Sequence, residues 1–121
     1  MSDKQKTIKT PFSYSGKGLH TGIEITVTVK PAEVDFGYKF KRIDLSPTVT
    51  IAAVAENVTE TARGTVIGSS NASVSTIEHL LASLYESGID NAEIELNGPE
   101  VPILDGSSKP WMDAITTSGI E

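Results

Sequence analysis

A glutamate and a histidine stand side by side at Glu78 and His79, where a segment with helical leucine spacing begins. The first turn of a helix carries partial positive charge, which disfavours imidazolium and keeps the ring in the neutral state that binds a metal. A neighbouring carboxylate that is not itself a ligand can accept a proton from a water that the metal activates. The pair therefore indicates the chemistry of a metal-dependent hydrolase.

The same pair has simpler interpretations. Ser75 and Glu78 have the spacing of a capping box, in which the glutamate bonds back to the first amide of the helix. His79 on an exposed helix face needs no function. At 100° per residue, the apolar stripe predicted to pack on the sheet leaves His79 on the opposite face, with Glu78 on the flank. The stripe consists of Ile77, Leu80, Leu81, Leu84 and Tyr85, and the outer face also carries Ala82, Ser83 and Glu86. The small residues there hint that another surface approaches closely.

Few further ligands are available for a metal. The sequence has no cysteine and no His-Glu-x-x-His pattern, and its second histidine is His20, in the glycine-rich run Ser-Gly-Lys-Gly-Leu-His-Thr-Gly. This run resembles neither a Walker loop nor a dinucleotide fingerprint, because no strand-turn-helix context surrounds it. A tight hairpin is the simpler interpretation of these glycines, and the metal hypothesis remains incomplete.

Composition sets the outer limits. A chain of 121 residues is predicted to be a single domain with a core of its own. Sixteen acidic and ten basic residues give a net charge of −6, which disfavours nucleic acid as a partner. The basic cluster of Lys39, Lys41 and Arg42 around Phe40 is interpreted as a solvated strand face. No apolar stretch is long enough to span a bilayer, and no signal peptide is evident, so a cytoplasmic protein is expected.

The hydrophobic rhythm changes near residue 70. Before that point it alternates as in strands, which predicts strands near residues 7–14, 23–29, 37–43, 49–54 and 65–67, followed by a polar loop at 68–73. After it come the helix with Glu78 and His79, a strand at 92–96, a turn at Asn97-Gly98, and a second helix. The second helix is predicted to begin at Ser107 or Ser108, to carry Pro110 in its first turn and to stop at Gly119. These elements predict an α+β fold, a two-layer sandwich in which two helices pack on one face of a mostly antiparallel sheet.

Four motifs in this order resemble one family. They are the run from Ser15 to Gly22, Thr-Ile-Glu-His-Leu at 76–80, Gly-Ile-Asp-Asn at 88–91, and Pro-Glu-Val-Pro-Ile-Leu-Asp-Gly-Ser at 99–107. Together they make nearly the whole chain similar to the N-terminal domain of UDP-3-O-acyl-N-acetylglucosamine deacetylase, a zinc enzyme of lipid A biosynthesis. The resemblance implies that His79 is a zinc ligand and that Glu78 acts as the catalytic base on the activated water. It places His20 on the active-site side without giving it a chemical role, whereas Glu100 and Asp105 are interpreted as structural.

The resemblance also implies what this chain does not supply. In the family the other zinc ligands, a histidine and an aspartate, and the histidine that serves as general acid come from a second domain of similar fold. Residues 1–121 are therefore expected to be the first domain of a two-domain deacetylase, inactive alone, whose partners are the second domain and the UDP-linked acyl-glucosamine substrate. The alternative is a non-catalytic binding or scaffold domain that uses the His79 face for a protein partner.

Overall fold

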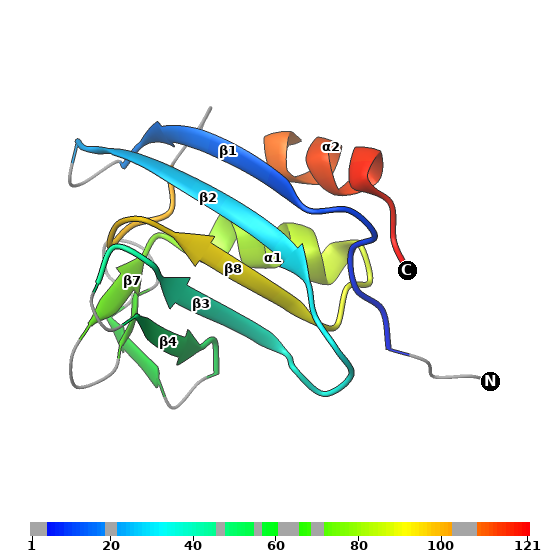
Figure 1. Cartoon of the computed structure of the whole chain (residues 1–121), viewed down its shortest axis with the longest axis horizontal. Helices are drawn as coiled ribbons and strands as arrows, with labels where there is room; N and C mark the ends of the chain where they lie inside the picture. Colours follow the sequence, from blue (N-terminus) through cyan, green and yellow to red (C-terminus); the bar gives the residue numbers. More distant parts are fainter. Residues whose placement is uncertain are drawn as a thin grey trace.

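The fold is built on a five-stranded sheet (Figure 1). The computed structural model describes residues 5–18, 22–45, 48–54, 57–60, 66–68, 72–102 and 109–121. The strand order in the large sheet is β1-β2-β8-β3-β4. Neighbouring strands are antiparallel except β3 and β8, which run parallel. The prediction of a mostly antiparallel sheet in an α+β fold is confirmed. The strands are β1 (Phe12–Lys17), β2 (Glu24–Pro31), β3 (Tyr38–Arg42), β4 (Val49–Ala52) and β8 (Ala92–Leu96).

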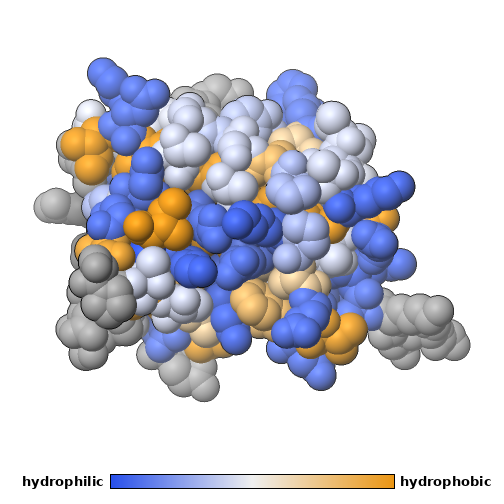
Figure 2. All heavy atoms as spheres, in the orientation of Figure 1, coloured by the Kyte–Doolittle hydropathy of each residue, from blue (hydrophilic) through white to orange (hydrophobic). Residues whose placement is uncertain are grey.

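Strict alternation in the central strands separates the two faces of the sheet. One face is buried and mostly apolar, and its central residues are Ile25, Val27, Val29, Ala92, Ile94 and Leu96. The other face is polar: the hydroxyls of Ser13 and Thr28 lie 2.7 Å apart, and Lys30 Nζ lies 3.0 Å from a carboxylate oxygen of Glu95. Figure 2 shows this polar face toward the viewer. Residues two apart in a strand share a face, so the alternation in sequence decided which side was covered.

Two helices cover the buried face. They are α1 (Glu78–Glu86) and α2 (Lys109–Ser118), which contact each other and lie behind the sheet in Figure 1. Leu80 and Leu84 of α1 share one hydrophobic cluster with Trp111 and Ile115 of α2. The predicted C-terminal stop is confirmed, because Gly119 has a φ of +86° and donates its amide to the Ile115 carbonyl at 3.0 Å. The start predicted for this helix, at Ser107 or Ser108, lies outside the described residues.

A second, smaller sheet packs beside the first. It contains β5 (Val58–Glu60), β6 (Val66–Gly68) and β7 (Ser73–Ser75), which are antiparallel in that order. The sequence predicted a strand near β6 but missed β5. It also placed a loop and a helix cap where β7 lies. Strands of three residues are too short for alternation to identify, and β7 has one buried valine between an exposed and a half-buried serine.

Two other predictions need correction. The first strand begins at Phe12 rather than Thr7, because residues 7 and 8 form only isolated bridges, to Asn91 and Ile120. Arg42 is not on a solvated face: it is only 9% exposed and lies on the same side of β3 as Phe40.

Among the described residues no helix is long and apolar enough to cross a membrane.

Candidate functional site

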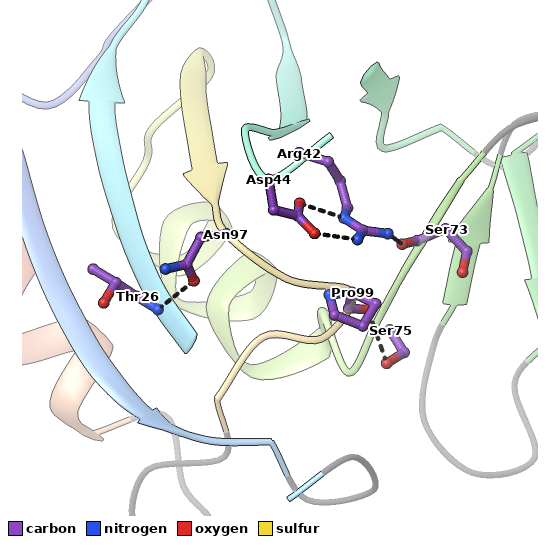
Figure 3. Close-up of polar contacts among 7 residues, drawn as sticks. All are labelled: Thr26, Arg42, Asp44, Ser73, Ser75, Asn97 and Pro99. Carbon is purple, nitrogen blue, oxygen red and sulfur yellow. Dashed lines mark hydrogen bonds and ion pairs between the residues drawn. The ribbon is translucent and has the colours of Figure 1, made fainter. Parts of the chain in front are cut away.

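The helix that carries Glu78 and His79 begins differently from the prediction. Ser75 is the last residue of β7, and the helix cap is Ile77, which makes no side-chain capping hydrogen bond. The capping-box interpretation of Ser75 and Glu78 is therefore wrong. Ser75 cannot cap the helix because its backbone is paired with residues 99–101. Its amide donates to the Pro99 carbonyl at 2.9 Å, and its carbonyl accepts from the Val101 amide at 3.0 Å. Figure 3 shows Ser75 against Pro99.

Thr76 turns the chain from β7 into α1. Its φ is +61°, in the left-handed region that a β-branched residue rarely adopts. Its side chain is buried, and its hydroxyl lies 3.0 Å from Oε2 of Glu100, which is also buried. Two residues later Glu78 opens the first turn of α1, followed by His79. The site residues are thus placed by a short, tightly bonded turn.

The buried face of α1 is rotated relative to the predicted stripe. Ser83, predicted to face outward, is fully buried, and its Oγ donates to the His79 carbonyl at 2.8 Å. Tyr85, predicted to pack inward, is 79% exposed. The predicted stripe came from α1 alone and could not include the contact that α1 makes with α2. Glu78 and His79 are both half-buried, so His79 lies at the border of the buried face, not directly opposite it.

The prediction of a zinc site can be compared with the side chains that could ligate a metal. Among the residues that the structure describes, no three histidine, cysteine, aspartate or glutamate side chains gather as a metal site. A catalytic zinc takes three protein ligands and keeps one open position. His79 can supply one imidazole nitrogen, but the described part of the chain does not complete the set. His20 and Asp105 lie outside the described residues.

An ion pair next to the site was not predicted. The Arg42 guanidinium donates from Nε to Asp44 Oδ1 at 3.0 Å and from Nη2 to Oδ2 at 2.6 Å. Its Nη1 donates to the Ser73 carbonyl at 3.3 Å, so one side chain of the large sheet holds β7 of the small sheet (Figure 3). The hydrogen bond from Arg42 is the main cause that lowers the pKa of Asp44 below its ordinary value. The alternation in Lys-Phe-Lys-Arg could have indicated that Arg42 shares the buried face with Phe40, but nothing in the pattern indicated its partners Asp44 and Ser73.

The chain after β8 is held close to the large sheet. A Cβ on Gly98 would lie 2.8 Å from Cγ1 of Ile25, whose side chain is buried. The next residue back, Asn97, accepts a hydrogen bond from the Thr26 amide at 2.9 Å (Figure 3). Gly98 is therefore required by close approach. The path from β8 through residues 97–101 delivers Pro99 and Glu100 to the turn before α1.

Comparison with known proteins covers nearly the whole chain. The family model of LpxC, UDP-3-O-acyl N-acetylglycosamine deacetylase, matches residues 5–121. A bifunctional enzyme LpxC/FabZ from Bacteroides thetaiotaomicron is 57% identical over 118 residues, which are 98% of this chain and 26% of that protein. A UDP-3-O-acyl-N-acetylglucosamine deacetylase from Citrifermentans bemidjiense is 53% identical over 117 residues, 97% of this chain and 38% of that protein. The deacetylase of Pseudomonas entomophila is 46% identical over 118 residues.

The chain spans about a quarter to two-fifths of the length of these relatives. The match runs through the large sheet, the small sheet, and the turn that carries Glu78 and His79 into α1. Because a family model covers residues 5–121, the chain belongs to the UDP-3-O-acyl N-acetylglycosamine deacetylase family.

Proposed function

We propose that this chain supplies Glu78 and His79 to the active site of a zinc-dependent deacetylase. Its substrate would be UDP-3-O-acyl-N-acetylglucosamine, from which it removes the N-acetyl group in lipid A biosynthesis. The observation that carries the proposal is the placement of the pair at the first turn of α1, in a chain whose relatives bear the name of this deacetylase over 97–98% of its length. A cytoplasmic location stays part of the proposal.

The two side chains have different roles. His79 would be a zinc ligand through one nitrogen of its imidazole ring. Zinc, when bound, supplies a Lewis acid that polarises the acetamide carbonyl and makes a water more acidic. Glu78 would accept the proton of that water as its oxygen attacks the carbonyl carbon. The C–N bond would then break as the nitrogen takes up a proton from an acid that this proposal places outside residues 1–121, which gives acetate and a glucosamine amine.

The remaining groups would come from a second domain. This is supported by the longer relatives, of which the chain spans 26–39%, and by the single imidazole that the described residues bring to α1. Residues 1–121 would then form the first domain of a two-domain enzyme. Without the second domain, the chain should neither hold catalytic zinc nor release acetate, because one imidazole cannot compete with water and buffer as three converging ligands do.

A second candidate function has one observation in its favour. Tyr85 is 79% exposed on α1, and large exposed aromatic side chains are enriched at protein interfaces. A non-catalytic scaffold domain could bind a protein partner through the face of α1 with His79, and the exposed Tyr85 on the same helix would extend that surface. It would need neither the acidity of Glu78 nor a metal, so Glu78→Gln would leave its function unchanged.

The experiment compares Glu78→Gln with His79→Ala in the longer enzyme of which we propose this chain is a part. Glu78→Gln should keep zinc and lower kcat by about 10² to 10⁴, the usual contribution of a general base. His79→Ala should lose zinc, measured by atomic absorption. Glu86→Gln, an exposed glutamate on the same helix, is the matched control. Equal loss of metal in both site variants would contradict the separate roles.

The isolated chain provides a second measurement. Zinc titration calorimetry and acetate release are each measured on residues 1–121 alone. Weak, non-stoichiometric zinc binding without turnover is expected. Tight one-to-one binding with turnover would show that residues 1–121 hold a complete site, and the two-domain proposal would fail.

A further inference from the structure

The turn between β7 and α1 holds a threonine where a glycine would be expected. Among the described residues, positive φ occurs at four glycines, at Asp35 and at Thr76. Glycine adopts this region without strain, and aspartate tolerates it, whereas a β-branched residue is disfavoured there. Thr76 is also buried, at 3% exposure. A conformation this unfavourable persists only where the surroundings over-determine it, and such positions cluster at functional sites.

The Thr76 hydroxyl has a partner that glycine would leave unpaired. Its Oγ1 lies 3.0 Å from Oε2 of Glu100, and the Glu100 side chain is 0% exposed. A buried carboxylate is costly unless hydrogen bonds satisfy it. Thr76 thus contributes a donor to a fully buried acidic group, which explains why a hydroxyl residue occupies the strained position.

The backbone around both residues is paired at the same place. Ser75 forms a parallel bridge with Glu100, and the amides of Ser75 and Val101 complete it on either side. Thr76 is therefore the first residue beyond this bridge, and Glu78 and His79 follow it by two and three positions. The side-chain hydrogen bond of Thr76 therefore lies one residue before the helix cap, Ile77.

We propose that Thr76 and Glu100 are positioning residues for the site on α1. The buried hydrogen bond between them holds the left-handed turn at Thr76. It thereby sets the direction in which α1 begins and so the orientation of Glu78 and His79 in its first turn. Neither residue touches the substrate in this proposal, which rests on the proposed function for its catalytic consequence. The substrate, the zinc ligands and the base are unchanged by it.

The experiment removes the hydroxyl and restores it. Thr76→Val keeps the shape but loses the donor, and Thr76→Ser keeps the donor. In the longer enzyme, Thr76→Val should lower kcat at least tenfold with KM within twofold, and Thr76→Ser should stay within threefold of the original kcat. Glu100→Ala should behave like Thr76→Val. Thr50→Val, an exposed threonine on β4, is the matched control and should change neither constant.

A second variant tests whether Thr76→Val lowers kcat only because it destabilises the fold. Ile51→Val trims the core under β4, far along the sheet from α1, and should lower the melting temperature without lowering kcat. If it lowers kcat as much as Thr76→Val does, or if Thr76→Val stays within twofold of the original enzyme, the positioning proposal is overturned.

A measurement on the 121-residue chain does not depend on catalysis. The Leu81 amide donates to the Ile77 carbonyl at 3.0 Å and closes the first turn of α1. In Thr76→Val, hydrogen exchange of this amide should accelerate at least tenfold relative to amides in β2, and in Thr76→Ser it should not. Unchanged exchange would overturn the proposal. Failure of the proposed function would instead appear as absent acetate release by the unmodified longer enzyme.

Discussion

The large and small sheets are held together in different ways. In the large sheet, strands of four to eight residues alternate, and their apolar face is covered by two helices in one cluster. In the small sheet, each strand has three residues, and β7 is held from outside by Arg42, Pro99 and Val101. The large sheet therefore supplies most of the apolar burial, whereas the small sheet adds Ile67 and Val74 to the same cluster and is also held by polar contacts from other elements. Glu78 and His79, the residues proposed to do chemistry, come shortly after β7 of the small sheet in the sequence.

This contrast predicts where the largest loss of stability will occur. Phe40 is fully buried at the centre of the large sheet, so Phe40→Ala should lower the free energy of unfolding by about 3–5 kcal/mol. Ile67→Val in β6 of the small sheet should cost about 0.5–1.5 kcal/mol. Urea unfolding followed by circular dichroism measures both. A larger loss from Ile67→Val would break the comparison.

The contact between the two sheets is the next largest effect. Arg42→Met keeps a long apolar stem but removes the bonds to Asp44 and Ser73. Hydrogen bonds to charged groups contribute about 1.5–3 kcal/mol, so a loss of this size is expected. Hydrogen exchange should accelerate more in β7 than in β2. Lys41→Met, on the opposite face of the same strand, is the control, and equal protection of β7 in both variants would contradict the role given to Arg42.

The same contrast explains which features could be predicted from sequence. Ile25, Val27 and Val29 alternate with polar residues over a full strand, and Ala92, Ile94 and Leu96 do the same, so both strands and their buried faces were correctly predicted. Trp111, Ile115 and Gly119 likewise placed the second helix. In β5 and β7 three residues give no period, and Ser75 had the spacing of a cap although its backbone is paired with residues 99–101.

The sequence proposes the residues of the candidate site, but it does not indicate what positions them. Glu78 and His79 stand out by type and position, and the resemblance of the motifs named a role for each. The left-handed turn at Thr76 and its bond to Glu100 join residues 24 apart in sequence, and nothing local in the sequence indicates that they meet. The exposure of Tyr85 was also not predicted, because a stripe drawn from α1 alone takes no account of the elements packed around the helix.

Close approach beside β8 gives a third prediction. Gly98→Ala would bring a methyl group within 2.8 Å of the buried Ile25 side chain, so the core has to shift. Overpacking of this kind costs about 1–3 kcal/mol. A double variant with Ile25→Val should recover part of the loss, because the contact is to Cγ1 and Cδ1 of Ile25 and valine lacks Cδ1. Thermal unfolding of the single and double variants measures this. Strict additivity of the two losses would argue against the contact.

The smallest expected effect is a pH dependence at the contact between the sheets. The hydrogen bond from Arg42 lowers the pKa of Asp44, so the folded state favours the carboxylate. This contribution is fully present above the ordinary carboxyl value of about 3.9 and is lost as the pH falls through the lower value of the folded state. Asp44 is partly exposed, so the pair should contribute less than about 1 kcal/mol.

Asp44→Asn tests this contribution, because the amide still accepts one hydrogen bond but carries no charge. Its stability should therefore fall less steeply than that of the original chain between pH 5 and the acid limit of folding, and the two curves should converge at the lowest pH. Asp113→Asn removes a carboxylate that pairs with Lys109 on exposed α2 and should leave β7 protection unchanged. If Asp44→Asn lost stability equally at every pH, shape rather than charge would hold the two sheets together at Arg42.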